Sequence, residues 1–156
     1  MRFRRSTSVK PKILVDTTFI LPALGIEVEE EAMSIIPLFR KFNIYYLEVS
    51  ILEAMWKIIK LVPTDKLNRV RMGLHAIRST YYLLKPSPEA YMDAITIYRE
   101  GHRDYIDALH YTSAKTEGMP LLTIDYEFID FLKGHGYQVD GIINTPKDLS
   151  KLVSKT

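Results

Sequence analysis

Residues 12–18 of this 156-residue chain read KILVDTT. The first four form a short apolar run with β-branched residues, the pattern of a strand that is buried on both faces of a sheet. An acidic residue, Asp16, follows at once, and from Thr17 onward the pattern becomes helical. A buried strand that passes directly into a helix is typical of a parallel sheet with helical crossovers.

The same alternation continues along the chain. Further strands are expected at residues 44–47, 81–84, 119–124 and 141–144. Helices are expected at residues 29–42, 51–62 (with Ser50 as N-cap), 64–78, 89–99, 104–117, 126–133 and 147–153. Strands that alternate with helices predict right-handed crossovers and an α/β fold in which helices cover both faces of the sheet.

The composition is that of an ordinary globular domain, with 47% hydrophobic and 26% charged residues. A length of 156 residues fits one domain. Because the chain has no cysteine, disulfides, thiolate zinc sites and a cysteine nucleophile are excluded.

Residues 1–11 are expected to form a basic arm, and residues 12–156 a single domain. The arm contains Arg2, Arg4, Arg5 and Lys10 and no acidic residue. Such a segment either is a solvated tail or holds phosphate backbones. No apolar run approaches the ~20 residues that span a bilayer. We therefore expect a soluble, cytoplasmic protein with no membrane partner.

Four acidic residues, far apart in the sequence, are expected at one edge of the sheet. Asp16 and Asp125 directly follow strands, whereas Glu53 and Asp107 lie in the first turns of helices. In parallel sheets, ligands bind outside the carboxyl ends of the strands, where helices begin. Carboxylates held together repel one another unless a cation intervenes, and hard divalent cations prefer oxygen ligands. The pattern favours a metal site.

Each acid also has an explanation without metal. Asp16 and Asp125 are suitable N-caps for the helices that follow them. Ser50 and Glu53 fit a capping box. Asp104 is suited to cap its helix, with Asp107 stabilised by the helix dipole. The residues alone leave the two explanations open.

Several other chemistries lack their sequence markers. The histidines His75, His102, His110 and His135 are scattered and have no zinc-binding spacing such as HExxH. There is no GxSxG elbow for a serine nucleophile and no GxxxxGK or GxGxxG loop for nucleotides.

Three segments together resemble the motifs of the PIN domain family, whose best-populated branch is the VapC ribonuclease toxins. Residues 15–20 (VDTTFI) resemble its opening strand with Asp-Thr-Asn, although Thr18 stands where the family often has Asn. Residues 49–53 (VSILE) resemble its second motif, a serine followed three residues later by a glutamate. Asp107 to Gly118 and then residues 121–125 (LLTID) resemble its closing pattern, with the last two acids at the usual separation of 18 positions.

The resemblance implies a three-layer α/β/α sandwich with a five-stranded parallel sheet in the order 3-2-1-4-5. It also implies a Mg²⁺ or Mn²⁺ site in which Asp16, Glu53 and Asp107 hold the first metal ion and Asp125 completes the site or helps to hold a second. Four residues carry hydroxyl groups beside the acids: Thr17, Thr18, Ser50 and Thr123. Their hydroxyl groups would orient the ligands, or the residues would be strand-end residues without a special role. Asp104 would be the true third ligand, an additional ligand or only a cap; Asp107 is preferred because its register to Gly118 and Asp125 matches the family pattern.

The activity implied is a metal-dependent endoribonuclease of the VapC toxin type, restrained by a small antitoxin and commonly dimeric. Lys57 and Arg103 are weaker candidates for contact with the RNA phosphates, since each is equally explained as a helix-surface residue. Two alternatives remain: a PIN nuclease in RNA processing, and a non-catalytic PIN module that binds RNA or protein.

Overall fold

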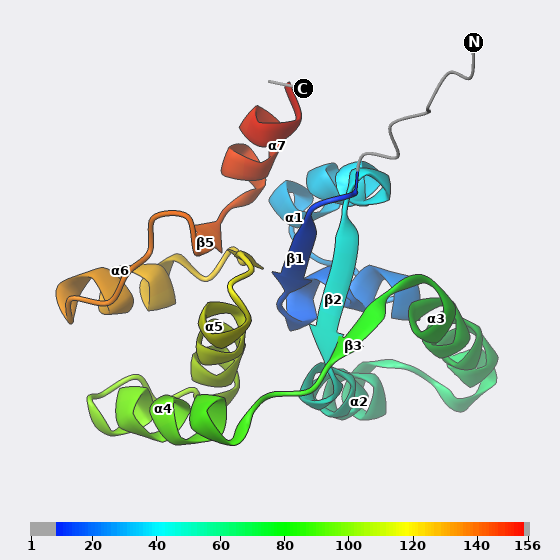
Figure 1. Ribbon diagram of the computed structural model, residues 1–156. Coiled ribbons are helices and arrows are strands. Elements are labelled where there is room, and N and C mark those ends of the chain that lie inside the picture. The colour runs from blue at the N-terminus through cyan, green and yellow to red at the C-terminus, as the bar shows by residue number, and fades with distance from the viewer. Residues whose placement is uncertain (1–8, 155–156) are drawn as a thin grey trace, which may run out of the picture.

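The computed structural model describes residues 9–154, so most of the expected basic arm lies outside it. Its centre is a five-stranded parallel sheet in the order β3-β2-β1-β4-β5 (Figure 1). The strands are β1 (Lys12–Val15), β2 (Asn43–Leu47), β3 (Tyr82–Leu84), β4 (Leu121–Leu122) and β5 (Ile143–Asn144). The predicted order and the parallel pairing are confirmed.

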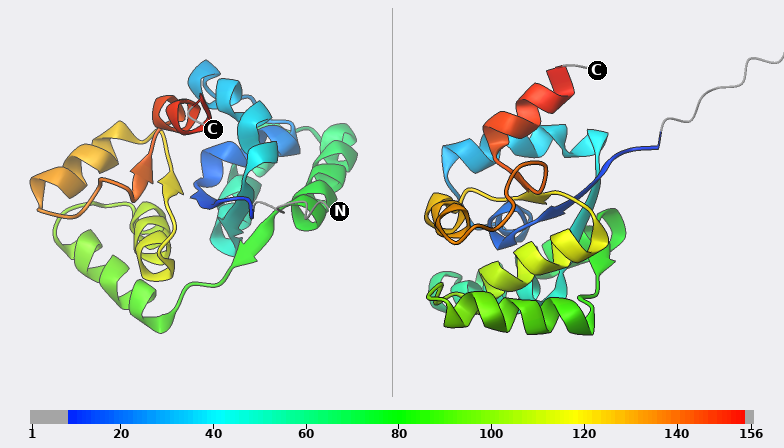
Figure 2. Two further views of the ribbon diagram at one scale, coloured as in Figure 1. Left: turned by 45° about the horizontal axis from the view of Figure 1, so that its top comes forward. Right: turned by 60° about the vertical axis from the view of Figure 1, so that its left-hand side comes forward.

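Helices cover both faces of the sheet, as predicted. One face is covered by the 3₁₀ helices η1 (Thr17–Phe19), η2 (Leu21–Leu24) and η3 (Ile36–Lys41) and by α1 (Glu30–Ile35), α2 (Glu48–Leu61), α3 (Leu67–Thr80) and α7 (Pro146–Ser154). The other face is covered by α4 (Pro88–Arg99), α5 (Tyr105–Glu117) and α6 (Tyr126–Gly134). Helices α4 and α5 lie side by side in both views of Figure 2.

Strand β1 lies at the centre of the sheet because both of its faces are apolar. Ile13 and Val15 belong to the core on one side of the sheet and Leu14 to the core on the other. All three are at most 1% exposed. Burial of such side chains stabilises a fold by roughly 1.5–3 kcal/mol each. The apolar run therefore places Asp16, the next residue, at the central edge of the sheet.

Two predicted helices are divided in the structure. The segment 29–42 forms α1 and then the 3₁₀ helix η3, which has Pro37 in its first turn. Proline has no N–H to continue the α-helical ladder, which accounts for the change there. The segment 64–78 begins as the 3₁₀ helix η4 (Thr64–Lys66) before α3. Among residues 9–154, no helix is both long and apolar enough to cross a membrane.

The expected N-cap role of Ser50 is wrong. Helix α2 begins directly after β2, at Glu48, and its N-cap residue Leu47 makes no side-chain cap. Ser50 is therefore inside the first turn and fully buried. By contrast, α5 begins after Asp104, which accepts hydrogen bonds from Ile106 and Asp107, and ends at Gly118 with φ 64°. Both ends of this helix agree with the prediction.

Candidate active site

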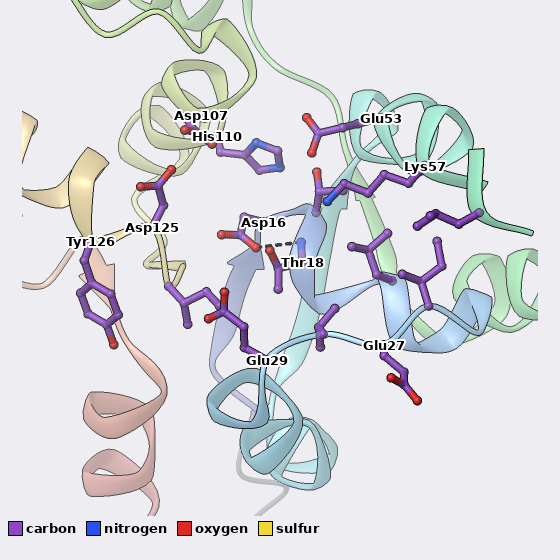
Figure 3. Close-up of a pocket in the computed structure, with 16 residues that line it drawn as sticks. Asp16, Thr18, Glu27, Glu29, Glu53, Lys57, Asp107, His110, Asp125 and Tyr126 are labelled. Carbon is purple, nitrogen blue, oxygen red and sulfur yellow. Dashed lines mark hydrogen bonds between the residues drawn. The ribbon is translucent and has the colours of Figure 1, made fainter. Parts of the chain in front are cut away.

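The four acids predicted from the sequence line one pocket at the carboxyl end of the sheet. The pocket has a volume of about 730 Å³, and Asp16, Glu53, Asp107 and Asp125 are among its lining residues. Figure 3 shows Asp107 and Asp125 on one side of Asp16, and Glu53 with Lys57 on the other. The acids come from the end of β1, from α2, from α5 and from the turn before α6.

Asp16 and Asp125 are held by a set of short local hydrogen bonds. Asp16 caps η1 by accepting the N–H of Thr18 at 3.0 Å, and Thr123 also hydrogen-bonds its carboxyl group. The Thr123 hydroxyl oxygen accepts the N–H of Asp125 at 3.1 Å. Asp125 in turn caps α6 by accepting the N–H of Phe128 at 2.9 Å. Asp16 and Asp125 therefore each cap a helix and line the pocket at the same time.

Burial and mutual repulsion make the ionised pocket unfavourable without a counter-charge. Burial, reinforced by Asp125 and Glu53, raises the pKa of Asp16 from 3.8 to about 7. Burial, reinforced by Asp125, Asp104 and Asp16, raises the pKa of Asp107 to about 9. Burial also raises the pKa of Glu53, opposed by the Thr17 hydroxyl and by Lys57. These carboxyl groups therefore either retain protons or bind a cation at neutral pH.

His102 makes a contact with Asp107 that the sequence did not reveal. Its Nε2 atom lies 3.1 Å from Oδ2 of Asp107. Its ring stacks on Phe128, with ring centres 4.4 Å apart, and also contacts Phe131. His102 lies in the loop before α5, so no helical spacing relates it to Asp107. Two aromatic rings fix the imidazole, and the imidazole orients the carboxyl group.

A chain of buried hydroxyl and imidazole groups adjoins the acids, and two of its members, Thr17 and His110, line the pocket. Thr17 donates to Ser50, with their Oγ atoms 3.0 Å apart, and Ser50 Oγ lies 3.0 Å from Nε2 of His110. All three side chains are at most 5% exposed. The position of His110 one turn after Asp107 was the only sequence signal for its place near the site.

A family model described as a PIN domain matches residues 13–132, a range that contains all four acids. The chain belongs to the PIN domain family. This is a family of nucleases, and the match confirms the resemblance drawn from the three motifs. No curated protein sequence matches the chain significantly.

Several solved structures share the fold at low sequence identity. PAE2754 from Pyrobaculum aerophilum has a TM-score of 0.61 and 19% identity, covering 93% of this chain and 97% of that chain. A toxin–antitoxin complex from Klebsiella pneumoniae has a TM-score of 0.60 and 16% identity, covering 86% and 97%. VapC20 of Mycobacterium tuberculosis, described as a sarcin-ricin loop cleaving toxin, has a TM-score of 0.57 and 14% identity, covering 81% and 96%.

The donors of this PIN domain fit a hard divalent cation, although they are not closed around one. Carboxylate oxygens are the ligands that Mg²⁺ and Mn²⁺ prefer, and the raised pKa values of Asp16 and Asp107 reflect a need for positive charge. Among residues 9–154, however, no three His, Asp or Glu side chains are gathered tightly enough to hold a metal ion. The acids line an open pocket rather than a finished coordination shell.

The weaker site candidates divide between those at the pocket and those outside it. Thr18 and Lys57 line the pocket. Asp104 does not line it and serves as the N-cap of α5. Arg103 does not line it either, and its guanidinium lies 5.1 Å from the centre of the Tyr98 ring. The structure brings Lys57 to the acids but not Arg103.

The outer wall of the pocket contains residues that were not predicted. Glu27, Glu29 and Tyr126 line it together with apolar side chains (Figure 3). The Tyr126 hydroxyl donates to Glu31, and this hydrogen bond raises the pKa of Tyr126 to about 12. Glu27 and Glu29 lie in the loop before α1; the predicted helix started at residue 29, whereas α1 begins at Glu30.

Proposed function

We propose that this PIN domain is a metal-dependent endoribonuclease of the VapC toxin type. The observation that carries the proposal is the gathering of Asp16, Glu53, Asp107 and Asp125 in one pocket at the carboxyl end of the sheet. Two of these carboxyl groups have pKa values raised to about 7 and about 9, as expected where a cation is needed to balance their charge.

Each residue of the pocket has a distinct part in the proposed reaction. Asp16, Glu53 and Asp107 hold Mg²⁺ or Mn²⁺, and Asp125 completes the set. A metal ion held there would supply an activated water and neutralise charge on the scissile phosphate. Thr123 and His102 orient Asp16 and Asp107 respectively. Lys57 provides the cationic side chain among these pocket residues for contact with a substrate phosphate.

A small antitoxin is the proposed partner. Solved structures with the same fold include a toxin–antitoxin complex from Klebsiella pneumoniae and VapBC2 from Rickettsia felis bound to a DNA fragment from its promoter. Those partners belong to those proteins, and they support the toxin assignment here over a role in RNA processing. A small gene adjacent to that of this chain, whose product co-purifies with it, is the expected finding.

The direct test is cleavage of mixed single-stranded RNAs with Mn²⁺, with and without a chelator. Asp16→Asn and Asp107→Asn should each abolish cleavage and keep the fold, because the amide has a similar shape but no charge. Asp65→Asn, at an exposed residue of η4, is the matched control and should cut normally. Cleavage that survives the chelator, or either pocket substitution, contradicts the assignment. Calorimetric Mn²⁺ binding without any cleavage indicates a binding module instead.

A further inference from the structure

The polar chain Thr17–Ser50–His110 ends on a backbone carbonyl. Nδ1 of His110 lies 2.8 Å from the carbonyl oxygen of Ile106. A carbonyl oxygen only accepts, so Nδ1 must carry the proton. Burial lowers the pKa of His110 to about 4, which keeps the ring neutral at physiological pH. A neutral ring with its proton on Nδ1 has an unprotonated Nε2.

That tautomer fixes the direction of every hydrogen bond in the polar chain. Nε2 is an acceptor, so the Ser50 hydroxyl 3.0 Å away donates to it. With its own proton committed, Ser50 accepts the proton of Thr17 at 3.0 Å. All the protons therefore point from the pocket toward His110.

The polar chain joins three segments that each carry one of the site acids. Thr17 follows Asp16, Ser50 is one turn before Glu53 in α2, and His110 is one turn after Asp107 in α5. In the hydrophobic core, polar groups of this kind cost stability compared with apolar packing unless every one of them is hydrogen-bonded. Here all three members are bonded, and they connect parts of the chain that are 33 and 60 residues apart.

The outer end of the polar chain reaches Glu53. The Thr17 side chain also lies beside the Glu53 carboxyl group and helps to lower its pKa. The proton of the Thr17 hydroxyl is donated to Ser50.

We propose that His110 is a positioning residue of the nuclease site: as the Nδ1–H tautomer it orders Ser50 and Thr17 so that the segments bearing Asp16, Glu53 and Asp107 are held together. The proposal rests on the proposed function for its metal. It assigns His110 no contact with substrate, because Ser50 and Ile106 occupy its two ring nitrogens.

The tautomer is tested without any metal or substrate. Two-bond ¹H–¹⁵N correlation spectra of the ¹⁵N-labelled, metal-free protein distinguish protonated from unprotonated ring nitrogens. His110, assigned by the loss of its signals in His110→Gln, is expected to show a protonated Nδ1 and an unprotonated Nε2 across pH 6–8. A proton on Nε2 would reverse the direction of the polar chain and overturn the proposal.

The positioning role is tested by breaking the polar chain at either hydroxyl. Thr17→Val and Ser50→Ala should each weaken Mn²⁺ binding and lower kcat by about 10–100-fold, the usual effect of losing groups that orient metal ligands. KM for RNA should stay within a few-fold, because Ser50 is fully buried and the Thr17 hydroxyl donates inward to it. Thr17→Ser keeps the hydroxyl group and should recover most of both losses.

Thr112→Val is the matched control. Thr112 is a buried residue of α5 whose hydroxyl donates to the carbonyl oxygen of Ala90, away from the pocket. It should lose stability as the other variants do but keep Mn²⁺ affinity and kcat. Equal losses in Thr112→Val and Ser50→Ala, at matched temperatures below unfolding, would make the polar chain merely structural and overturn the inference. A native protein that binds no Mn²⁺ would instead contradict the proposed function.

Discussion

Two histidines near the pocket are held by different contacts and have different effects. His110 is 1% exposed and is bonded at both ring nitrogens. His102 is half-buried against Phe128 and has one nitrogen on Asp107. Neither role followed from sequence spacing: His102 is placed by a loop, and His110 meets Ser50 only because α2 and α5 meet behind the acids. In the sequence the histidines are scattered and have no spacing that indicates these contacts.

Replacing His102 tests whether its hydrogen bond matters more than its packing. His102→Phe keeps an aromatic ring to stack on Phe128 and removes the partner of Asp107 Oδ2. We expect about a tenfold or larger loss of Mn²⁺ affinity, because a carboxylate ligand loses the group that orients it. Calorimetric titration measures the loss, and unfolding in urea checks that the stability changes little. His102→Gln restores a donor and should recover part of the affinity; a phenylalanine variant with native affinity would refute the orienting role.

Asp104 and Asp107 differ in role because of where α5 begins. The helix starts at Tyr105, so Asp104 turns its oxygen onto the N–H groups of Ile106 and Asp107 while Asp107 faces the pocket. The prediction from sequence preferred Asp107 as the ligand on its 18-residue spacing to Asp125 but left Asp104 open. Because α5 begins at Tyr105, Asp104 is its N-cap and Asp107 lines the pocket.

A pair of substitutions at Asp104 separates capping from metal binding. Asp104→Ser keeps an N-cap and should keep both stability and Mn²⁺ affinity. Asp104→Ala should lower the free energy of unfolding by about 1 kcal/mol, the usual cost of a lost N-cap, with Mn²⁺ affinity changed only a few-fold. Chemical unfolding and calorimetry measure the two quantities. A serine variant that is stable but binds no Mn²⁺ would show that Asp104 is a ligand.

Helix α3 approaches η2 so closely that one position of the helix accepts only glycine. A Cβ atom at Gly73 would lie 2.1 Å from the carbonyl oxygen of Ala23. Gly73→Ala should therefore destabilise the protein by about 1–3 kcal/mol, although alanine is the better helix former. Gly134→Ala, in α6 with no atom within 4 Å of the added Cβ, should instead stabilise by about 0.4–1 kcal/mol. Urea unfolding curves compare them; a stabilised Gly73 variant would mean that the two helices can move apart.

At the scale of the molecule, the sheet was predictable because its central strand is strongly patterned. Ile13, Leu14 and Val15 form an uninterrupted apolar run after Lys12, and the order 3-2-1-4-5 followed from the family resemblance. Strand ends were less predictable: β4 covers only Leu121–Leu122 of the expected 119–124. The four acids were found because the carboxyl ends of parallel strands meet at one edge. The outer wall of the pocket was not predicted, because Glu27 and Glu29 lie in a loop, where no hydrophobic periodicity indicates the direction of a side chain.

The raised pKa values of Asp16 and Asp107 predict how the stability of the metal-free protein depends on pH. In the unfolded chain both groups titrate near 3.8, whereas in the folded chain they titrate at about 7 and about 9. Between these values the folded state holds protons that the unfolded state has lost. The free energy of unfolding therefore falls as pH rises from about 4 through 7 and 9. The pKa of Glu53, which burial also raises, adds to this slope.

Added metal should remove that pH dependence. A cation takes the place of the protons, so saturating Mn²⁺ at pH 8 should raise the melting temperature. At a Mn²⁺ concentration of a hundred times Kd, the free energy of unfolding should increase by about 2.7 kcal/mol. At pH 5, where protons already neutralise the pocket, the same addition should have a much smaller effect. Asp16→Asn should make the metal-free pH profile less steep, with the contribution of Asp107 remaining, and should lose the response to Mn²⁺, because the Asp16 carboxyl group contributes to both. Melting curves from pH 5 to 9 test this. A native protein whose stability is flat with pH, or whose response to Mn²⁺ survives Asp16→Asn, would mean that the charge repulsion in this pocket does not drive metal binding.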